Sequence, residues 1–250
     1  MDLFGAEQFK VDKPIRLIEL FGGIGSQAMA FRDIGVDFEI YKFVELDKSA
    51  VNSYNAIHGT NFKPIDIKDV KGLDLEIKEK DKYCYLMTYS FPCTDMSLAG
   101  LQKGMDEGSG TSSSLLWEVK RLLCECDELL KKGSEYGMPD VLVMENVVQV
   151  HNDQNRPNFE KWVKFLEKLG YQNFCEDLNA KDYGIPQSRD RCFMVSILSE
   201  KSVDYEFPKK IPLKYKMKDF LENDVEEEYY LKSENADKSV KEFMEKGELK

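Results

Sequence analysis

Hydrophobic residues occur along this chain in short runs that are separated by longer segments of mixed polarity. The short apolar runs, which predict strands, cover residues 15–21, 38–46, 83–89, 140–147 and 191–198. Apolar residues that recur every three or four positions predict helices over 26–34, 47–57, 115–132 and 158–169. Strands that alternate with helices at this spacing indicate an α/β fold whose mostly parallel sheet is covered on both faces.

Composition narrows the class of protein. The chain has 250 residues, of which 42% are hydrophobic, enough for one sizeable domain with a small appendage. It has neither an apolar run of the roughly 18–20 residues that a membrane span needs nor a signal peptide at its start. We therefore expect a cytoplasmic protein with no membrane partner. The six cysteines form no CxxC pair, and His58 and His151 show no partner pattern, so we expect no disulfide framework and no metal.

Charge is distributed unevenly along the chain. The net charge of −11 argues against broad electrostatic binding of nucleic acid by this chain alone. The strand and helix pattern weakens after about residue 205, and residues 220–250 carry ten acidic and five basic side chains. We therefore predict a catalytic domain over 1–205 and a separate segment over 206–250, which would begin a recognition region or form a docking tail.

A glycine-rich stretch, ELFGGIGSQA, follows the first predicted strand and opens the first helix. Gly23, Gly25 and Ala28 fit the pattern G-x-G-x-x-[G/A], which lets the backbone turn sharply and approach a nucleotide. Glu45 ends the second strand, where an acceptor for ribose hydroxyls belongs. Asp66 follows a further expected short strand. A glycine turn that serves only packing would show the same pattern, and both NAD and S-adenosylmethionine (AdoMet) remain open as ligands.

A thiol, a carboxyl and guanidinium groups follow or precede other predicted strands. Cys93 comes directly after a proline at the end of the strand 83–89, and Glu145 ends the strand 140–147. Ligands of open parallel sheets bind beyond the carboxyl ends of the strands. Arg189 and Arg191 reach that edge only if the last strand runs antiparallel to the others.

This set of side chains suits methylation of a cytosine ring. A thiolate adds to carbon 6 when a protonated carboxyl bonds ring nitrogen 3 and an arginine supports the exocyclic oxygen. Carbon 5 then becomes nucleophilic and can take the methyl group of AdoMet. Loss of the proton from carbon 5 expels the thiolate. A nicotinamide-dependent dehydrogenase has no evident use for this arrangement.

Four stretches in this order resemble the motifs of bacterial or phage cytosine-5 DNA methyltransferases: ELFGGIGSQA, SFPCTDMSLAG, MENV and IPQSRDRCF. The resemblance covers roughly residues 15–230 and implies a Rossmann-like, AdoMet-dependent methyltransferase fold with an antiparallel last strand. It implies catalytic roles for Cys93, Glu145, Arg189 and Arg191. AdoMet, whose product is S-adenosylhomocysteine (AdoHcy), would contact Phe21, Gly23, Ile24, Gly25, Glu45, Leu46, Asp66, Ile67, Pro92 and Leu115. The target base in double-stranded DNA would meet Phe91, Pro92, Ser97, Asn146 and Gln187.

The chain departs from this family in three places. Thr94 stands where glutamine is common, and Leu46 stands where a tryptophan often stacks on adenine. The last family motifs and the recognition region are missing after residue 250. The resemblance therefore leaves three readings beside a simple enzyme: one of two subunits, whose partner carries the missing region, an inactive AdoMet-binding regulatory chain, and a tRNA cytosine-5 methyltransferase. The setting expected for the enzyme is a restriction–modification system.

Overall fold

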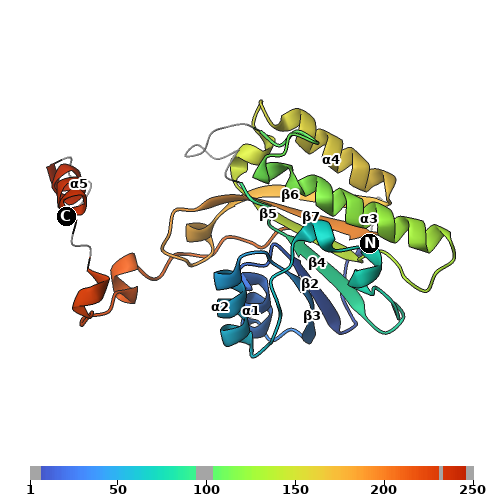
Figure 1. The fold of residues 1–250 in the computed structure, drawn as a ribbon, viewed down its shortest axis with the longest axis horizontal. Helices are drawn as coiled ribbons and strands as arrows, with labels where there is room; N and C mark the ends of the chain where they lie inside the picture. The colour runs from blue at the N-terminus through green and yellow to red at the C-terminus, as the bar shows by residue number, and fades with distance from the viewer. Residues whose placement is uncertain (1–6, 94–103, 231–232, 246–250) are drawn as a thin grey trace.

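A six-stranded sheet forms the centre of the computed structural model, which describes residues 7–93, 104–230 and 233–245 (Figure 1). The strands, in their order across the sheet, are β3 (Phe38–Val44), β2 (Ile15–Leu20), β4 (Cys84–Tyr89), β5 (Val141–Asn146), β7 (Asp190–Leu198) and β6 (Tyr171–Asn179). The pairs between β3 and β5 are parallel, whereas β7 runs antiparallel to both of its neighbours. A small second sheet pairs β1 (Glu7–Gln8) with β8 (Val203–Asp204). The expected sheet with its antiparallel last long strand is confirmed.

Helices cover both faces of the sheet (Figure 1). They are α1 (Ser26–Asp33), α2 (Lys48–His58), α3 (Leu116–Lys131) and α4 (Arg156–Lys168), whereas α5 (Glu234–Glu245) lies away from the sheet. Short 3₁₀ helices are η1 (Ile67–Asp69), η2 (Gly72–Leu75), η3 (Ser112–Leu115), η4 (Val148–His151), η5 (Ala180–Asp182), η6 (Met217–Phe220) and η7 (Glu227–Tyr229). The larger core packs α3 and α4, through residues such as Leu122 and Trp162, against the strands, and a smaller core packs α1 on the opposite face. All six residues of β4 are buried, as expected for a central strand with an uninterrupted apolar run.

Two segments differ from the expectation. The strand expected before Asp66 is absent: residues 59–66 are irregular, and Ile65 N donates to Glu45 O across 2.9 Å. This segment carries polar residues on both sides of Phe62 and none of its residues is buried, so little favours a strand there. Strand β6 was not expected from the sequence, because it lies at the sheet edge and the middle of it, Cys175–Asp177, is exposed.

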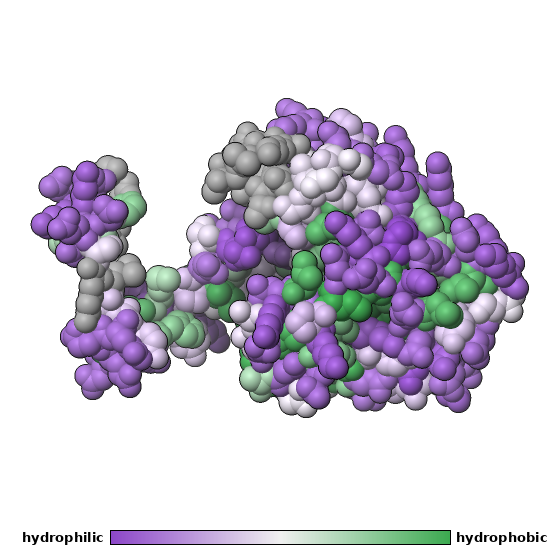
Figure 2. Space-filling view, in the orientation of Figure 1, coloured by the Kyte–Doolittle hydropathy of each residue, from purple (hydrophilic) through white to green (hydrophobic). Residues whose placement is uncertain are grey.

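Tyr205 and Phe207 still pack on the smaller core, and Ile211 N donates to Asp182 O; beyond this point the chain projects away from the sheet and ends in α5 (Figure 1). The surface of this projecting segment is mainly hydrophilic and carries a small hydrophobic patch (Figure 2). Exposed apolar side chains here include Tyr215, Met217 and Phe220. The boundary at residue 205 stays a prediction. Among the described helices, none has both the length and the apolar character that crossing a bilayer requires.

Candidate active site

The turn between β2 and α1 is built from backbone that only small residues adopt easily. Gly23 and Gly25 have φ values of 55° and 81°, in the left-handed region. A Cβ on Gly25 would lie 2.3 Å from His58 Nε2 and 2.5 Å from Tyr54 Cε2, so a side chain cannot fit there. Phe21 adopts a φ of 56° at the start of the same turn. The turn therefore requires glycine at Gly25 for conformation and for space.

Glu45 ends β3 beside this turn, and backbone amides hold its carboxylate. Gly23 N donates to Glu45 Oε2 across 3.0 Å, and Asp47 N donates to Oε1 across 2.8 Å. Each carboxylate oxygen keeps a second lone pair that can accept a ligand hydroxyl. Asp66 is fixed in a similar way, because its Oδ1 accepts from Lys68 N across 3.0 Å.

A hollow of about 540 Å³ opens next to these two carboxylates. The residues that line it are Phe21, Val44, Glu45, Leu46, Asp47, Lys48, Ile65, Asp66, Ile67, Ser90, Pro92 and Leu115. Leu46 and Ile65 are 63% and 37% exposed, so apolar surface is offered to the hollow. A hollow of this size with apolar walls and a few fixed polar groups suits a nucleoside-sized ligand.

Two further hollows continue along the same edge of the sheet. One, of about 580 Å³, is lined by Phe21, Gly22, Gly23, Ile24, Ser26, Gln27, Ala30, Ser90, Glu145, Arg189 and Phe193. The other, of about 290 Å³, is lined by Glu145, Leu178, Ala180, Tyr183, Arg189, Arg191 and Phe193. Neighbouring hollows share residues, Phe21 and Ser90 in one case and Glu145 and Arg189 in the other. The three hollows therefore lie side by side over the carboxyl ends of the parallel strands, and together they are called the groove below.

Glu145 is the centre of charge in this groove. Arg191 Nε lies 3.0 Å from Glu145 Oε1, and Arg189 Nη2 lies 4.0 Å from the same oxygen. The antiparallel direction of β7 makes this contact, because Glu145 pairs with Phe193 and both arginines lie near the start of that strand. Cys93 follows the neighbouring strand β4 and is a half-buried free thiol beside the larger core.

Asn146 and Phe91 lie deeper than the sequence-based assignment of base contacts implies. Asn146 Nδ2 donates to Phe91 O across 3.0 Å, and the two residues are only 3% and 2% exposed. Asn146 Oδ1 also accepts from Val147 N. The Asn146 side chain therefore joins the end of β5 to the backbone before Cys93, and the side chains of both residues are buried.

Three other expected contacts are placed differently or lie outside the described residues. Ile24 is 46% exposed and lines the middle hollow with Glu145, not the hollow beside Glu45. Gln187 is exposed, and its side chain makes no hydrogen bond or ion pair within the described residues. Ser97 belongs to residues 94–103, which lie outside them.

Sequence reasoning missed Ser90 and Ile65. Ser90 Oγ is buried, has no hydrogen-bond partner in the part of the chain that the structure describes, and lines two of the hollows. The sequence carried a signal for Ser90, because this residue directly follows the predicted strand 83–89. Ile65 had none, because the segment before Asp66 looked like a strand.

Most of this chain is similar to known methyltransferases. Residues 15–249 match the family described as C-5 cytosine-specific DNA methylase. Type II methyltransferase M2.ScrFI of Lactococcus lactis subsp. cremoris is 34% identical over 88% of this chain and 71% of its own length. Orphan methyltransferase M.SssI of Spiroplasma monobiae is 32% identical over 75% of this chain and 60% of its own length.

A solved structure supports the fold independently. The S. pombe Dnmt2 methyltransferase superposes with a TM-score of 0.64 at 21% identity, over 92% of this chain and 66% of that one. At 21% identity, the similarity to this structure shows the fold alone. The family match over residues 15–249 shows the family. The chain belongs to the C-5 cytosine-specific DNA methylase family.

Proposed function

We propose that this chain transfers the methyl group of AdoMet to carbon 5 of cytosine in DNA, as a DNA (cytosine-5-)-methyltransferase of a restriction–modification system. One observation carries the proposal. Glu145, paired with Arg191, lines a hollow that adjoins the one beside Glu45, and Cys93 follows the neighbouring strand at the same edge.

The hollow beside Glu45 suits the adenosine part of AdoMet. Leu46, Ile65 and Phe21 would enclose the adenine ring, since their apolar side chains line the hollow. Glu45 and Asp66 would accept hydrogen bonds from ribose hydroxyls and the exocyclic amine, because backbone amides already fix their carboxylates. When bound, AdoMet supplies an electrophilic methyl group. Ser90, between this hollow and the one that contains Glu145, would contact the part of the ligand that carries that group.

Cys93 would act as the nucleophile. Its thiolate adds to carbon 6 of the ring, and carbon 5 gains the electron density that lets it take the methyl group. Removal of the proton from carbon 5 restores the ring and breaks the carbon–sulfur bond, so Cys93 leaves as a thiolate. Pro92 shapes the segment that presents the thiol, and Asn146 fixes the same segment through Phe91 O.

Glu145 and Arg191 would polarise the ring. Arg191 occupies Glu145 Oε1, and Oε2 has no hydrogen-bond partner within the described residues. Oε2 is therefore free to share a proton with ring nitrogen 3, which draws charge out of the ring as the thiolate adds. Arg189, 4.0 Å from Oε1, would support the pair or the exocyclic oxygen of the base.

The negative net charge of this chain bears on how it would bind DNA. Neutralisation of phosphates by lysine and arginine supplies most non-specific affinity for DNA, and a chain of charge −11 is poorly suited to it. A base inside a duplex must also leave the stack, at a cost of a few kcal/mol. DNA binding would then depend on basic surface and recognition elements contributed by a second polypeptide.

Methyl transfer to mixed-sequence DNA and to tRNA tests the proposal. The assay follows tritium from labelled AdoMet at low salt, with and without the product of a neighbouring reading frame. We expect label in DNA, an increase when the second polypeptide is added, and loss in Cys93→Ala. Cys124→Ala, which removes a half-buried thiol on α3, is the matched control and should keep activity. Label in tRNA alone would favour the tRNA enzyme. No label, with intact AdoHcy binding, would favour a regulatory chain.

A further inference from the structure

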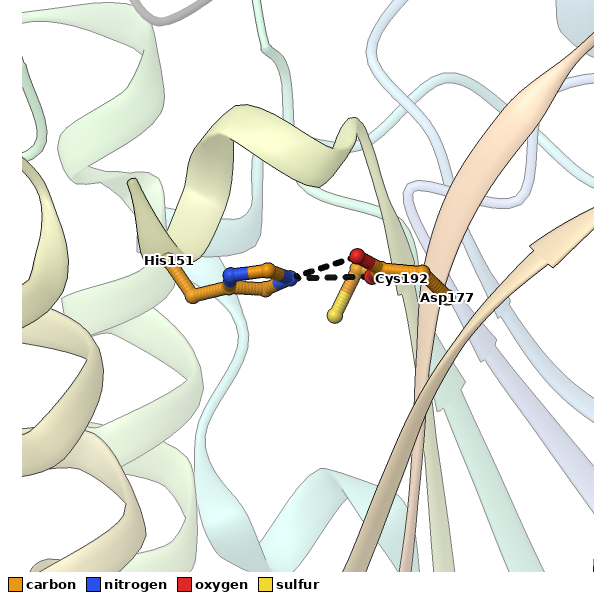
Figure 3. A group of neighbouring side chains, drawn as sticks. All are labelled: His151, Asp177 and Cys192. Atoms are coloured by element: carbon orange, nitrogen blue, oxygen red, sulfur yellow. Dashed lines mark hydrogen bonds and ion pairs between the residues drawn. The ribbon is translucent and has the colours of Figure 1, made fainter. Parts of the chain in front are cut away.

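His151, Asp177 and Cys192 point toward one another and form a group of potential metal ligands (Figure 3). The strand register places Asp177 and Cys192 on the sheet face opposite Glu145. His151 Nε2 is 2.9 and 3.1 Å from the two carboxylate oxygens of Asp177. One ligand atom each from His151, Asp177 and Cys192 lies within 4.8 Å of the others. A second thiol is adjacent, since Cys175 Sγ is 3.4 Å from Cys192 Sγ. Imidazole, carboxylate and one thiol therefore gather at one place, and the Cys175 thiol lies next to Cys192 without belonging to that group.

The strand register explains why residues far apart in the sequence meet here. Asp177 on β6 pairs directly with Cys192 on β7, and Cys175 pairs with Met194. Residues two apart on a strand share a face, so Cys175, Asp177 and Cys192 all point the same way. His151 ends η4, which follows β5, and its ring lies 5.8 Å from that of Phe159 on α4. The group is thus anchored to three neighbouring segments.

We propose that His151, Asp177, Cys175 and Cys192 bind a Zn²⁺ ion. Thiolate and imidazole ligands favour zinc over Mg²⁺ and Ca²⁺, which take oxygen ligands. Zinc–sulfur bonds of about 2.3 Å in a tetrahedron place two sulfurs roughly 3.8 Å apart, close to the separation seen here. A disulfide would need a much larger movement, to about 2.05 Å.

The exposure of the group is compatible with metal entry. Cys192 is fully buried, whereas Cys175 is exposed and the Asp177 side chain is 44% exposed, so an ion reaches the group from the edge strand β6. Binding of Zn²⁺ requires both thiols to lose their protons, so affinity should fall as the pH is lowered.

The position of the site suggests what the ion would do. Cys192 follows Arg191 in β7, so its side chain lies on the opposite face of the sheet from Arg191. A metal bound to Cys192 would therefore lie across the sheet from the Arg191–Glu145 pair. The ion would join η4, β6 and β7 and so steady the strand that carries Arg191. It would be a structural ion, and its binding does not depend on the proposed methyl transfer.

Titration of the full chain with Co²⁺ tests the site. The protein is purified with a reductant, stripped with a chelator, and followed by absorption, with Zn²⁺ then added as competitor. We expect one equivalent of Co²⁺ with thiolate charge-transfer bands and tetrahedral visible bands, which Zn²⁺ removes. Cys175→Ser and His151→Gln should each weaken binding by at least about tenfold. Both residues are accessible enough to change without emptying the core, and thermal melting of each variant confirms folding.

Cys124→Ser and Cys93→Ser are the control variants and should bind Co²⁺ like the wild-type chain. The proposal is overturned if the reduced protein shows no thiolate-to-cobalt bands, or if the cysteine and histidine variants of the group bind as tightly as the controls. It is also overturned if the reduced chain binds no metal and air oxidation removes two thiols in wild type but not in Cys175→Ser. That result would identify a redox-active dithiol instead.

Discussion

The two halves of the groove hold their carboxylates in different ways. In the half built from β2 and β3, backbone amides of Gly23 and Asp47 hold Glu45. In the half built from β5 and β7, the side chain of Arg191 holds Glu145. Backbone amides in a tight turn cannot swing away, whereas a guanidinium on a long side chain can exchange partners. The first half is therefore fixed before any ligand arrives, and the second can rearrange around a base.

The largest effect is expected from a change at Glu145, the carboxylate that a side chain holds. Glu145→Gln keeps the size of the side chain but removes the acid that shares a proton with ring nitrogen 3. We expect methyl transfer to fall by about 100-fold or more, the usual range for a lost general acid. AdoHcy affinity, measured by calorimetry, should stay unchanged. Glu128→Gln, at an exposed position on α3, is the control. Retained transfer in Glu145→Gln would mean that the pair with Arg191 is only structural.

Glu45→Ala tests the fixed half. Loss of the ribose acceptor, and of the bonds that hold the turn, should weaken AdoHcy binding by about tenfold or more, equivalent to roughly 1.4 kcal/mol. Transfer should recover when AdoMet is raised to saturation, in contrast to Glu145→Gln. Glu167→Ala, an exposed glutamate on α4, is the matched control. Equal AdoHcy affinity in the two variants would contradict the assignment of Glu45.

Asn146→Ala tests whether the hydrogen bond from Asn146 to Phe91 O is needed for stability and for methyl transfer. The change leaves the buried Phe91 carbonyl without its donor, which should cost about 1–3 kcal/mol of unfolding free energy. It should also lower the rate of transfer with little change in AdoHcy affinity, because the segment before Cys93 loses its anchor. Chemical denaturation and calorimetry on the same preparations separate the two effects. A variant with the stability and the methyl-transfer rate of the wild-type chain would contradict this role for Asn146.

The smallest effect concerns Glu19, which lies under the glycine turn and is fully buried. Burial raises the pKa of this carboxyl, although the hydrogen bond from Tyr54 opposes the shift. A raised pKa in the folded state means that stability is greatest below the ordinary value of 4.5 and falls as the pH rises toward the folded-state pKa. Within that window the loss is at most about 1.4 kcal/mol per pH unit.

Glu19→Gln should flatten this dependence, because glutamine has no proton to lose. Urea midpoints measured from about pH 5 to pH 8 should fall with pH for the wild-type chain and stay nearly level for the variant. Parallel curves for the two proteins would show that burial of Glu19 carries no net cost.

The parts of the site that the sequence predicted are those with local signals. The glycine turn, the cysteine after Pro92 and the acid at the end of β5 each follow a recognisable strand, and sheet topology brings them to one edge. The polar edge strand β6 has no such signal, because alternation of burial along it is weak. Burial of Asn146 and the gathering of Cys175 with Cys192 depend on the register of β5, β6 and β7. Residues without fixed spacing could not be paired from the sequence.

The central claim is that Cys93 forms a covalent bond to cytosine, and trapping tests it most directly. Mixed-sequence DNA in which cytosine is replaced by 5-fluorocytosine cannot lose a proton from carbon 5, so the adduct should persist. With AdoMet at low salt, and with the product of the neighbouring reading frame added, we predict a protein–DNA band that survives denaturing electrophoresis. The band should be absent in Cys93→Ser and present in Cys124→Ser. A band that persists in Cys93→Ser, or no band from the wild-type chain, would contradict the account.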